Sequence, residues 1–528
     1  MHQTGATALA IIASLNALLV RPDQVPLYSV LAAQLREVNL VEAAELLLQS
    51  ELALKQGRTL IRRDAICSAT ERRELARFFH SIAIYLANQQ QVDAAYACFE
   101  RATGYEPRSA HIYSNWAGIL LQTHRDEEAE RIASAAVMHD PLFAPAWTNL
   151  GKSLHYQGKT KEAITALQRA EGLSRDTRTA AAATTELGVA QLRDNCLVEA
   201  IASFRKVLTL TPNDPLAHFN FGVSLLRNGE FDEGWKHFEW RTDHSDQTSQ
   251  GQSSSAPNWN GEDISGKRIL LKTEYGFGDS IQFVRYARLL VARGAIVFLQ
   301  CEPELTRIFQ SIRDCNITSP EAAPPTVDYQ VRLLSLPHIL GTTLQTIPAS
   351  MPYLRPPAEE TRKWAEYFAK AERPLIGLAW FGNSRHGEFD RRRSVTLETL
   401  APLLSTRATF VSLQKGIDTE HINRAAPQLL NPMGECRDFA DTASIIENLD
   451  LIISVDTSVA HLAGALAKPV WLLSRFDADW RWLNDREDSP WYPTMRIFQQ
   501  PTPGDWAAVV TRIWDQLQSL SEKARVEN

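Results

Sequence analysis

Polar side chains suited to acid–base chemistry follow an apolar run near the middle of the chain. Gly276, Gly278 and Asp279 form a Gly-x-Gly-Asp segment directly after residues 268–274. Glycines let a ligand approach the backbone, and a helix that begins there offers free N–H groups. The carboxylate of Asp279 can accept a proton from an attacking hydroxyl group. A plain helix cap explains the same residues, so both interpretations stay open.

A second polar segment, DTSVAH, follows the apolar run at residues 449–455. Its Asp456, Thr457 and Ser458 favour a helix N-terminus, where free N–H groups bind a diphosphate. Thr457 and His461 are four residues apart and share one helix face, so His461 can reach the leaving phosphate or the sugar of a donor. The alternative is a capped helix with a histidine in the core.

Basic side chains follow two further apolar runs. The polar loop after residues 374–382 contains three consecutive arginines: Arg391, Arg392 and Arg393. Lys415 ends the run TFVSLQK. Guanidinium and ammonium groups suit phosphate oxygens, so these residues are candidate donor ligands, with a solvated surface as the alternative. No Asp-x-Asp metal motif stands at an expected strand end, so we expect a site with no metal ion and no other cofactor.

The elements that carry these residues alternate between strand and helix. Apolar runs at 268–274, 295–301 and 329–333 predict strands in one lobe, and runs at 374–382, 409–414, 449–455 and 469–473 predict strands in a second lobe. Prolines 352 and 356 mark the boundary, which gives lobes at 259–358 and 359–528. Such alternation implies parallel sheets, and open sheets of this kind bind ligands at the carboxyl ends of their strands. The sequence therefore predicts a cleft between two α/β lobes.

The first half of the chain repeats itself. Small residues recur at intervals of 34, 34, 37 and 34, at Ala83, Ala117, Gly151, Gly188 and Gly222. A second small residue follows each by 12, at Ala95, Ala129, Ala163, Ala200 and Gly234. Large apolar residues such as Phe99, Leu167, Phe204 and Phe238 fill fixed offsets. Small residues let paired helices approach closely, and a proline after the second helix ends the unit.

This pattern resembles tetratricopeptide repeats, with five units over residues 76–241. A degenerate hairpin with Ala32 and Ala44 predicts a helical cap within residues 1–75. Residues 242–258, TDHSDQTSQGQSSSAPN, have almost nothing apolar, so we expect a flexible linker there.

Asparagines stand two residues before the first small residue in three of the repeats: Asn115, Asn149 and Asn220. An amide offers both a donor and an acceptor, so a row of them can hold a peptide backbone without selecting its side chains. The row resembles the asparagine ladder of O-linked N-acetylglucosamine transferases. Local bonds within the repeats are the equal alternative. With either role, a solenoid of this kind usually binds another protein.

Composition and charge limit the class of protein. The chain has 528 residues, 44% of them hydrophobic and 22% charged, which is typical of a globular protein with three or four domains. Its net charge of −7 gives no case for nucleic-acid binding. Six scattered cysteines fit reduced thiols in a cytoplasmic protein. The apolar residues 8–20 lack a preceding basic residue and a cleavage site, so we expect a helix there and no signal peptide or membrane span.

The stretch DTSVAHLAGALAKPVWLL is similar to a segment of heptosyltransferase-like glycosyltransferases, and the resemblance extends over about residues 266–500. It implies the two-lobed fold called GT-B. It also implies that Asp279, with Gly278 before it, is the catalytic base, and that the arginine run contacts donor phosphates. A cluster of five aromatic residues either lines a sugar or base pocket or belongs to the core: Trp471, Trp480, Trp482, Trp491 and Tyr492.

Repeats followed by such a domain resemble bacterial flagellin-modifying glycosyltransferases. That resemblance implies transfer of a sugar, often a nonulosonic acid, from a nucleotide donor to Ser or Thr of an acceptor protein held by the repeats. Two alternatives remain: a transferase directed at saccharide or lipopolysaccharide, and a non-catalytic adaptor.

Overall fold

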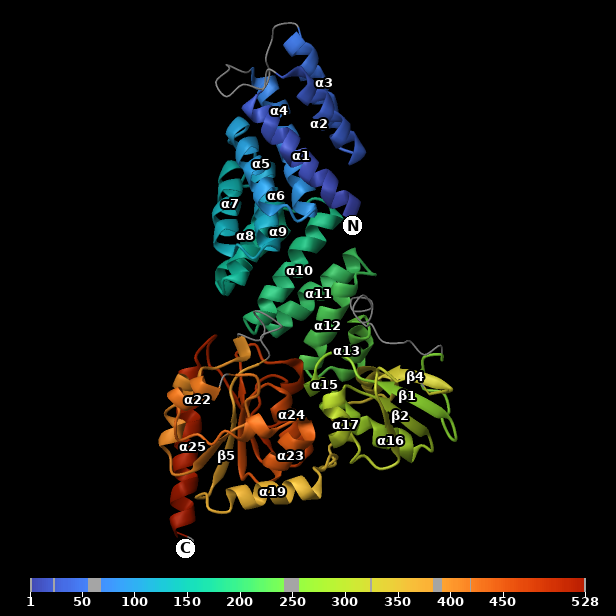
Figure 1. The fold of residues 1–528 in the computed structure, drawn as a ribbon, viewed down its shortest axis with the longest axis vertical. Coiled ribbons are helices and arrows are strands. Elements are labelled where there is room, and N and C mark those ends of the chain that lie inside the picture. The colour runs from blue at the N-terminus through green and yellow to red at the C-terminus, as the bar shows by residue number, and fades with distance from the viewer. Residues whose placement is uncertain are drawn as a thin grey trace. The chain divides into compact units, whose positions relative to one another are not determined.

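The computed structural model describes residues 2–21, 24–55, 68–241, 256–322, 325–382, 392–417 and 419–526 (Figure 1). The chain forms two compact units, residues 1–212 and residues 213–528. The first unit is helical, and the second combines one helical hairpin with two α/β lobes.

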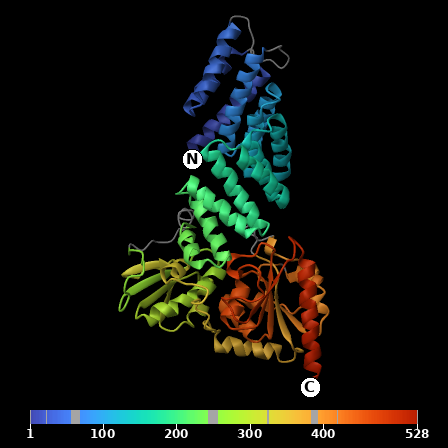
Figure 2. The ribbon, with the colours of Figure 1, turned by 180° about the vertical axis from the view of Figure 1, so that it is seen from behind.

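Antiparallel helix pairs build the first unit (Figure 2). Its helices are α1 (His2–Val20), α2 (Val25–Glu37), α3 (Val41–Lys55), α4 (Ala69–Asn88), α5 (Val92–Tyr105), α6 (Ala110–Gln122), α7 (Asp126–His139), α8 (Ala144–Tyr156), α9 (Thr160–Leu173), α10 (Thr177–Arg193) and α11 (Leu197–Leu210). Each of the pairs α2–α3, α4–α5, α6–α7, α8–α9 and α10–α11 packs as a hairpin.

Close helix packing explains the small residues of the repeat. A Cβ at Gly151 would lie 2.5 Å from Cγ of Leu167. A Cβ at Gly188 would lie 2.8 Å from Cζ of Phe204. The large residue of each hairpin therefore occupies the space that the small residue leaves, and the predicted repeats are confirmed.

The fifth repeat belongs to the second compact unit. It consists of α12 (Pro215–Arg227) and α13 (Phe231–Phe238). Trp235 is fully buried and donates from Nε1 to the Thr342 carbonyl over 3.0 Å. Its ring meets that of Trp480 edge to face at 5.3 Å. The boundary between the units thus lies at residues 212 and 213, within the region predicted as one repeat domain.

The first α/β lobe has a parallel four-stranded sheet in the order β3-β2-β1-β4. The strands are β1 (Arg268–Lys272), β2 (Ile296–Gln300), β3 (Cys315–Thr318) and β4 (Tyr329–Arg332), and Leu270 pairs with Phe298 on one side and Gln330 on the other. Its helical segments are α15 (Phe277–Phe283), η1 (Val284–Tyr286), α16 (Ala287–Ala292), α17 (Pro303–Phe309), η2 (Leu333–Ser335) and α18 (Leu336–Ile339). Strand β3 is absent from the prediction because CNIT is short and mostly polar.

The second lobe has a parallel five-stranded sheet in the order β6-β5-β7-β8-β9. The strands are β5 (Leu375–Ala379), β6 (Thr409–Ser412), β7 (Leu451–Val455), β8 (Val470–Ser474) and β9 (Met495–Gln499). The helical segments are α19 (Ala358–Phe368), α21 (Leu397–Leu400), η4 (Leu403–Ser405), α22 (Thr419–Ala425), η5 (Pro432–Glu435), α23 (Phe439–Glu447), α24 (Ser458–Ala465), η6 (Trp480–Trp482) and α25 (Trp506–Val526).

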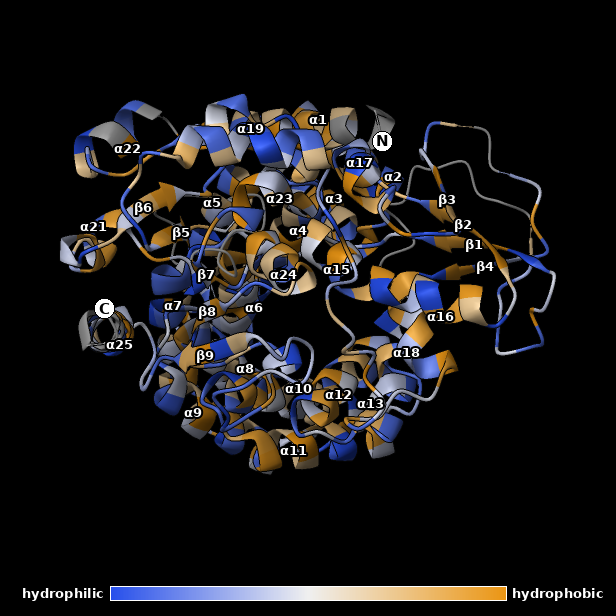
Figure 3. Ribbon diagram, turned by 90° about the horizontal axis from the view of Figure 1, so that it is seen from below, coloured by the Kyte–Doolittle hydropathy of each residue, from blue (hydrophilic) through white to orange (hydrophobic). Residues whose placement is uncertain are grey.

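Apolar strands form the centre of each lobe. Every residue of β5 and β7 is buried, as expected for strands covered on both faces. Figure 3 shows strands of both sheets in the orange of hydrophobic residues. The fold class predicted from the sequence, a tetratricopeptide solenoid followed by a two-lobed α/β fold of GT-B type, is confirmed.

The predicted linker is only partly described, because residues 242–255 lie outside the described residues. The carbonyl oxygens of Ala256 and Pro257 accept hydrogen bonds from Gln330 in β4, over 2.7 and 3.0 Å. Asn258 forms a bridge with the same residue. Residues 256–258 are therefore part of the first lobe rather than of a flexible segment.

No helix in the described ranges is both long and apolar enough to cross a membrane. The five cysteines that the structure describes are free: Cys98, Cys196, Cys301, Cys315 and Cys436.

Candidate functional site

The topology brings the two predicted catalytic segments to equivalent places in their lobes. In the first sheet the strand order reverses between β1 and β4, and the segment with Asp279 follows β1. In the second sheet it reverses between β5 and β7, and the segment with Asp456 follows β7. Such reversal points, at the carboxyl ends of parallel strands, are where open α/β sheets bind ligands.

The two segments touch each other, since α15 packs directly against α24 (Figure 3). A Cβ at Gly278 would lie 2.9 Å from Cδ2 of His461 and 3.6 Å from Cα of Ser458. Because Gly278 has no side chain, α24 of the opposite lobe packs closely against it. The sequence had suggested the approach of a ligand at this place.

His461 is buried at this contact, with 5% of its surface exposed. Its Nδ1 lies 2.9 Å from the Tyr492 hydroxyl group, and its ring stacks on that of Trp482 at 5.4 Å. Burial lowers the pKa of His461 well below its ordinary value, and the nearby Arg481 guanidinium acts in the same direction. The imidazole is therefore neutral, and its position fits a role in holding the lobes together.

Both carboxylate oxygens of Asp279 have partners. Oδ2 accepts from the backbone N–H of Gly276 over 3.1 Å, so Asp279 caps its own helix. Oδ1 forms an ion pair with the guanidinium of Arg481 from the second lobe. Asp279 is 22% exposed, so it remains accessible from one side.

Asp456 lies close to the same arginine. Its Oδ2 accepts from Nε1 of Trp482 over 2.9 Å, and its Oδ1 lies 3.8 Å from Nε2 of His461. Burial and the charge of Asp479 raise the pKa of Asp456. Burial alone would raise the pKa of Asp479 as well, but the charge and hydrogen bonds of Arg481 hold it below its ordinary value. Arg481 therefore stabilises the charged form of Asp479 more than that of Asp456.

Two of the three arginines in the run are described, and Arg391 lies outside the described residues. Arg393 donates from Nη1 to the Asp456 carbonyl over 2.7 Å, which ties the loop after β5 to the loop after β7. Arg392 binds Asp477 over 2.5 Å. The run is therefore located at the reversal point of the second sheet.

The sequence does contain an Asp-x-Asp pair, Asp477 and Asp479, a few residues beyond β8. Asp477 pairs with Arg392 and Arg475, and Asp479 pairs with Arg481 over 2.8 Å. No cluster of three or more His, Cys, Asp or Glu side chains able to hold a metal ion occurs in the described ranges.

The N-terminus of α24 directly follows Asp456. Thr457 occupies its N-cap position without a side-chain cap, and its hydroxyl lies 3.3 Å from Oγ of Ser454. Ser458 is the first residue of the helix and is only partly buried. The N–H groups of a first helical turn have no partner within the helix and attract anions.

Lys415 lies apart from these contacts. It is exposed, and its Nζ donates to the carbonyl groups of Cys436 and Arg437 over 3.0 and 3.2 Å. The structure thus connects Lys415 to the loop before α23.

The asparagines of the repeats make bonds between successive repeats. Asn149 donates from Nδ2 to the Ser114 carbonyl over 2.7 Å, and Nδ2 of Asn115 lies 3.0 Å from Nε2 of His80. Asn220 lies on α12 in the second compact unit. The local bonds that the sequence left as an alternative are therefore present at Asn115 and Asn149.

Most of the aromatic cluster belongs to the core. Trp480, Trp482, Trp491 and Tyr492 are almost fully buried.

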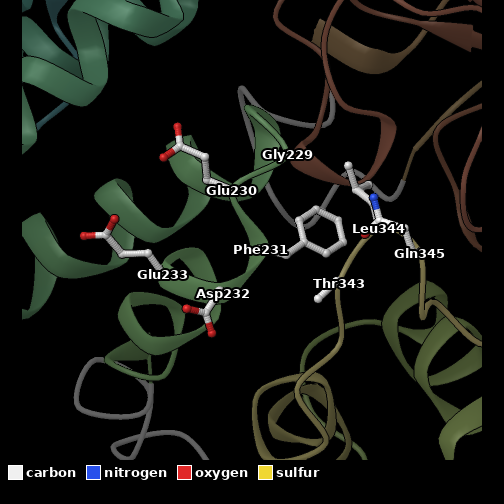
Figure 4. Close-up of a pocket in the computed structure, with 8 residues that line it drawn as sticks. All are labelled: Gly229, Glu230, Phe231, Asp232, Glu233, Thr343, Leu344 and Gln345. Carbon is white, nitrogen blue, oxygen red and sulfur yellow. The ribbon is translucent and has the colours of Figure 1, made fainter.

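A pocket of about 370 Å³ lies elsewhere in this unit, lined by residues 229–233 and 343–345 (Figure 4). None of the predicted site residues lines this pocket.

Sequence reasoning missed Arg481, Asp479 and Gln282. They are brought together by the packing of the two lobes, and the segment DADWRW around Arg481 resembles no catalytic pattern. The density of charged residues next to two tryptophans after a buried strand is the one local signal that points to it.

Comparison with known proteins gives a family match within the repeats and a curated relative over most of the chain. The family model described as tetratricopeptide repeat matches residues 148–215. Protein FlbA of Caulobacter vibrioides is 26% identical over 447 residues, which covers 77% of this chain and 72% of that protein.

The solved structures similar to this chain include a glycosyl transferase family 9 protein from Veillonella parvula, with a TM-score of 0.40 and 11% identity, over 51% of this chain and 100% of that one. PilF of Pseudomonas aeruginosa matches with a TM-score of 0.31 and 20% identity, over 34% of this chain and 79% of that one. The tetratricopeptide-repeat match thus lies within the helical hairpins α8 to α11 and reaches the start of α12.

Proposed function

We propose that this protein is a protein O-glycosyltransferase that moves a sugar from a nucleotide donor to Ser or Thr of an acceptor polypeptide. The observation that supports it best is the meeting of the Asp279 and Asp456 segments, each at the reversal point of a parallel sheet. A base from one lobe and an anion site from the other are the two parts that sugar transfer from a nucleotide requires.

The donor phosphates bind at the start of α24 and beside Arg393. The backbone N–H groups of Thr457 and Ser458 and the guanidinium group of Arg393 supply positive charge there. Arg392, which pairs with Asp477, and Lys415, which bonds to the loop before α23, are the further proposed donor contacts. His461 and Gly278 act indirectly, because they set the distance between α24 and α15.

Asp279 accepts the proton of the acceptor hydroxyl group. The hydroxyl oxygen bonds to the anomeric carbon while the bond from that carbon to the phosphate oxygen breaks, and the nucleotide leaves with the electron pair. A direct displacement of this kind inverts the anomeric configuration. The N–H groups of α24 and the guanidinium group of Arg393 stabilise the charge that develops on the leaving phosphate. We therefore expect the transfer reaction to proceed without a divalent ion.

The repeats hold the acceptor polypeptide. Asn115, Asn149 and Asn220 are the proposed contacts to the acceptor backbone, since an amide offers both a donor and an acceptor. The resemblance of the whole chain points to flagellin as the acceptor and to a nonulosonic acid as the sugar. The free thiols fit a reaction in the cytoplasm.

The variant Asp279→Asn tests this function. We expect it to lower transfer to an acceptor protein by about 10²–10⁴-fold, because loss of a general base costs that much, and to leave the affinity for the nucleotide unchanged. Mass spectrometry of flagellin incubated with the enzyme and UDP-, GDP-, ADP- or CMP-linked sugars measures transfer. Glu304→Gln, which changes an exposed carboxylate in the same lobe, is the matched control.

Full turnover by Asp279→Asn would show that Asp279 is not the base. Sugar recovered on a saccharide or lipopolysaccharide, with none on protein, would replace the protein acceptor by a glycan. Wild-type protein that binds no nucleotide would leave only the adaptor function.

A further inference from the structure

We propose that Arg481 is a positioning residue for the transfer reaction, which fixes the carboxylate of Asp279 across the interface between the two lobes. The inference rests on the proposed function, since it assigns Asp279 the role of base. It concerns a residue that no pattern in the sequence identified.

Arg481 is held rigidly before it reaches Asp279. The residue is 9% exposed. Its Nε donates to Oε1 of Gln282 over 2.7 Å, and its Nη1 donates to Oδ1 of Asp479 over 2.8 Å. The remaining nitrogen, Nη2, faces Oδ1 of Asp279. A guanidinium group with each nitrogen engaged has one orientation, so the oxygen that it contacts has one position.

Aromatic packing supports the guanidinium group from behind. Arg481 lies over the ring of Trp480 at 4.4 Å. That ring packs against Trp235 at 5.3 Å and Phe238 at 5.7 Å, both on the last helical hairpin. The hairpin therefore buttresses the residue that holds the proposed base.

The charges around Arg481 explain why an arginine is needed. Asp279 and Asp479 both pair with it, and Asp456 lies near enough to act on its charge. A neutral side chain would leave two carboxylates facing each other across the lobes. Asp279 would then turn away from the position that its helix cap and Arg481 define together.

A double-mutant cycle in the full-length chain tests the proposal. The variants are Arg481→Gln, Arg481→Lys, Asp279→Asn and Arg481→Gln with Asp279→Asn, assayed with whichever of the UDP-, GDP-, ADP- or CMP-linked sugars the wild type uses. We expect Arg481→Gln to lower kcat by about 10²-fold, the cost of a small misplacement of a catalytic group, with KM for the donor unchanged. Arg481→Lys should recover part of the rate because it restores the charge.

The double variant should be no slower than Asp279→Asn alone, because a residue that acts through Asp279 has nothing to position once the base is gone. Arg486→Gln, which breaks a neighbouring arginine–carboxylate pair at the surface, is the matched control. Thermal unfolding of each variant separates loss of fold from loss of positioning, and Arg481→Lys keeps the test valid if Arg481→Gln unfolds.

Two results would overturn the proposal: independent, multiplying losses in the double variant, or a raised donor KM with unchanged kcat in Arg481→Gln, which would make Arg481 a donor ligand. Wild-type protein that transfers no sugar from any of the four donors would instead contradict the proposed function itself, and the positioning role with it.

Discussion

The residues at the lobe interface differ in the partners that their side chains contact. The segments with Asp279 and with Asp456 to His461 could be identified from the sequence, because each is a short polar stretch directly after a buried strand. Arg481 could not, because it meets Asp279 across 202 positions of the chain. Local pattern carries no information about that contact, which depends on how two lobes pack.

Burial also changes the acid–base behaviour of single residues in the repeats. His80 on α4 is 9% exposed, and Nε2 of its ring lies 3.0 Å from Nδ2 of Asn115. Burial, helped by the charge of His111, lowers the pKa of His80 to about 4. The unfolded chain therefore takes up a proton below about pH 6.5 that the folded chain refuses.

The free energy of unfolding should accordingly fall as the pH drops from about 6.5 toward 4, by at most about 1.4 kcal/mol per pH unit for this residue. His80→Gln, which can still accept from Asn115, should flatten that dependence. Urea unfolding of the full chain at about pH 7 and about pH 5 measures it, with His421→Gln at an exposed position as control. An unchanged pH slope in His80→Gln would contradict the assignment.

Helices and strands were predicted correctly where the spacing of their small or apolar residues repeats over a long stretch of the chain. The two ladders of small residues predicted all five hairpins, because each small residue has a fixed large partner. Strands β3 and β9 were not predicted: β3 is short and polar, and β9 follows a loop with no turn pattern that marks it. Their place is set by neighbouring strands rather than by their own residues.

The packing between hairpin helices makes a direct prediction for Gly188 in α10. Gly188→Ala should destabilise the protein by about 1–3 kcal/mol, because the added Cβ would lie 2.8 Å from Cζ of the fully buried Phe204. Gly172→Ala in α9, where nothing lies within 4 Å, should raise stability by up to about 1 kcal/mol. Chemical denaturation compares the two. Equal effects would mean that close packing does not explain the small residues.

At the scale of the molecule, the boundary between the two compact units does not coincide with the end of the repeat pattern. Repeat periodicity continues to residue 241, but the last hairpin is part of the unit that contains the lobes. Phe231, Trp235 and Phe238 are buried there together with Trp480 and Trp491. Periodicity could not reveal this, because it reports how a hairpin is built and not which surface covers it.

Two fragments test this division. Residues 213–528 should fold cooperatively and bind nucleotide like the full chain. Residues 256–528 lack α12 and α13 and should be much less stable, because burial of each large aromatic contributes roughly 1.5–3 kcal/mol. Circular dichroism on heating, with nucleotide added, measures both properties. Equal stability of the two fragments would show that the last hairpin is not a structural part of this unit.

The central claim is that a nucleotide binds at the start of α24, beside Arg393. Isothermal titration of the full chain with UDP, GDP, ADP and CMP tests it most directly, in the wild type, in Arg393→Gln and in the control Arg407→Gln, whose arginine pairs with Glu372 at the surface. We expect one nucleotide to bind the wild type and the control equally. It should bind Arg393→Gln at least about tenfold more weakly, since a charged hydrogen bond contributes about 1.5–3 kcal/mol. Binding to none of the four, or equal binding to all three proteins, would contradict the claim.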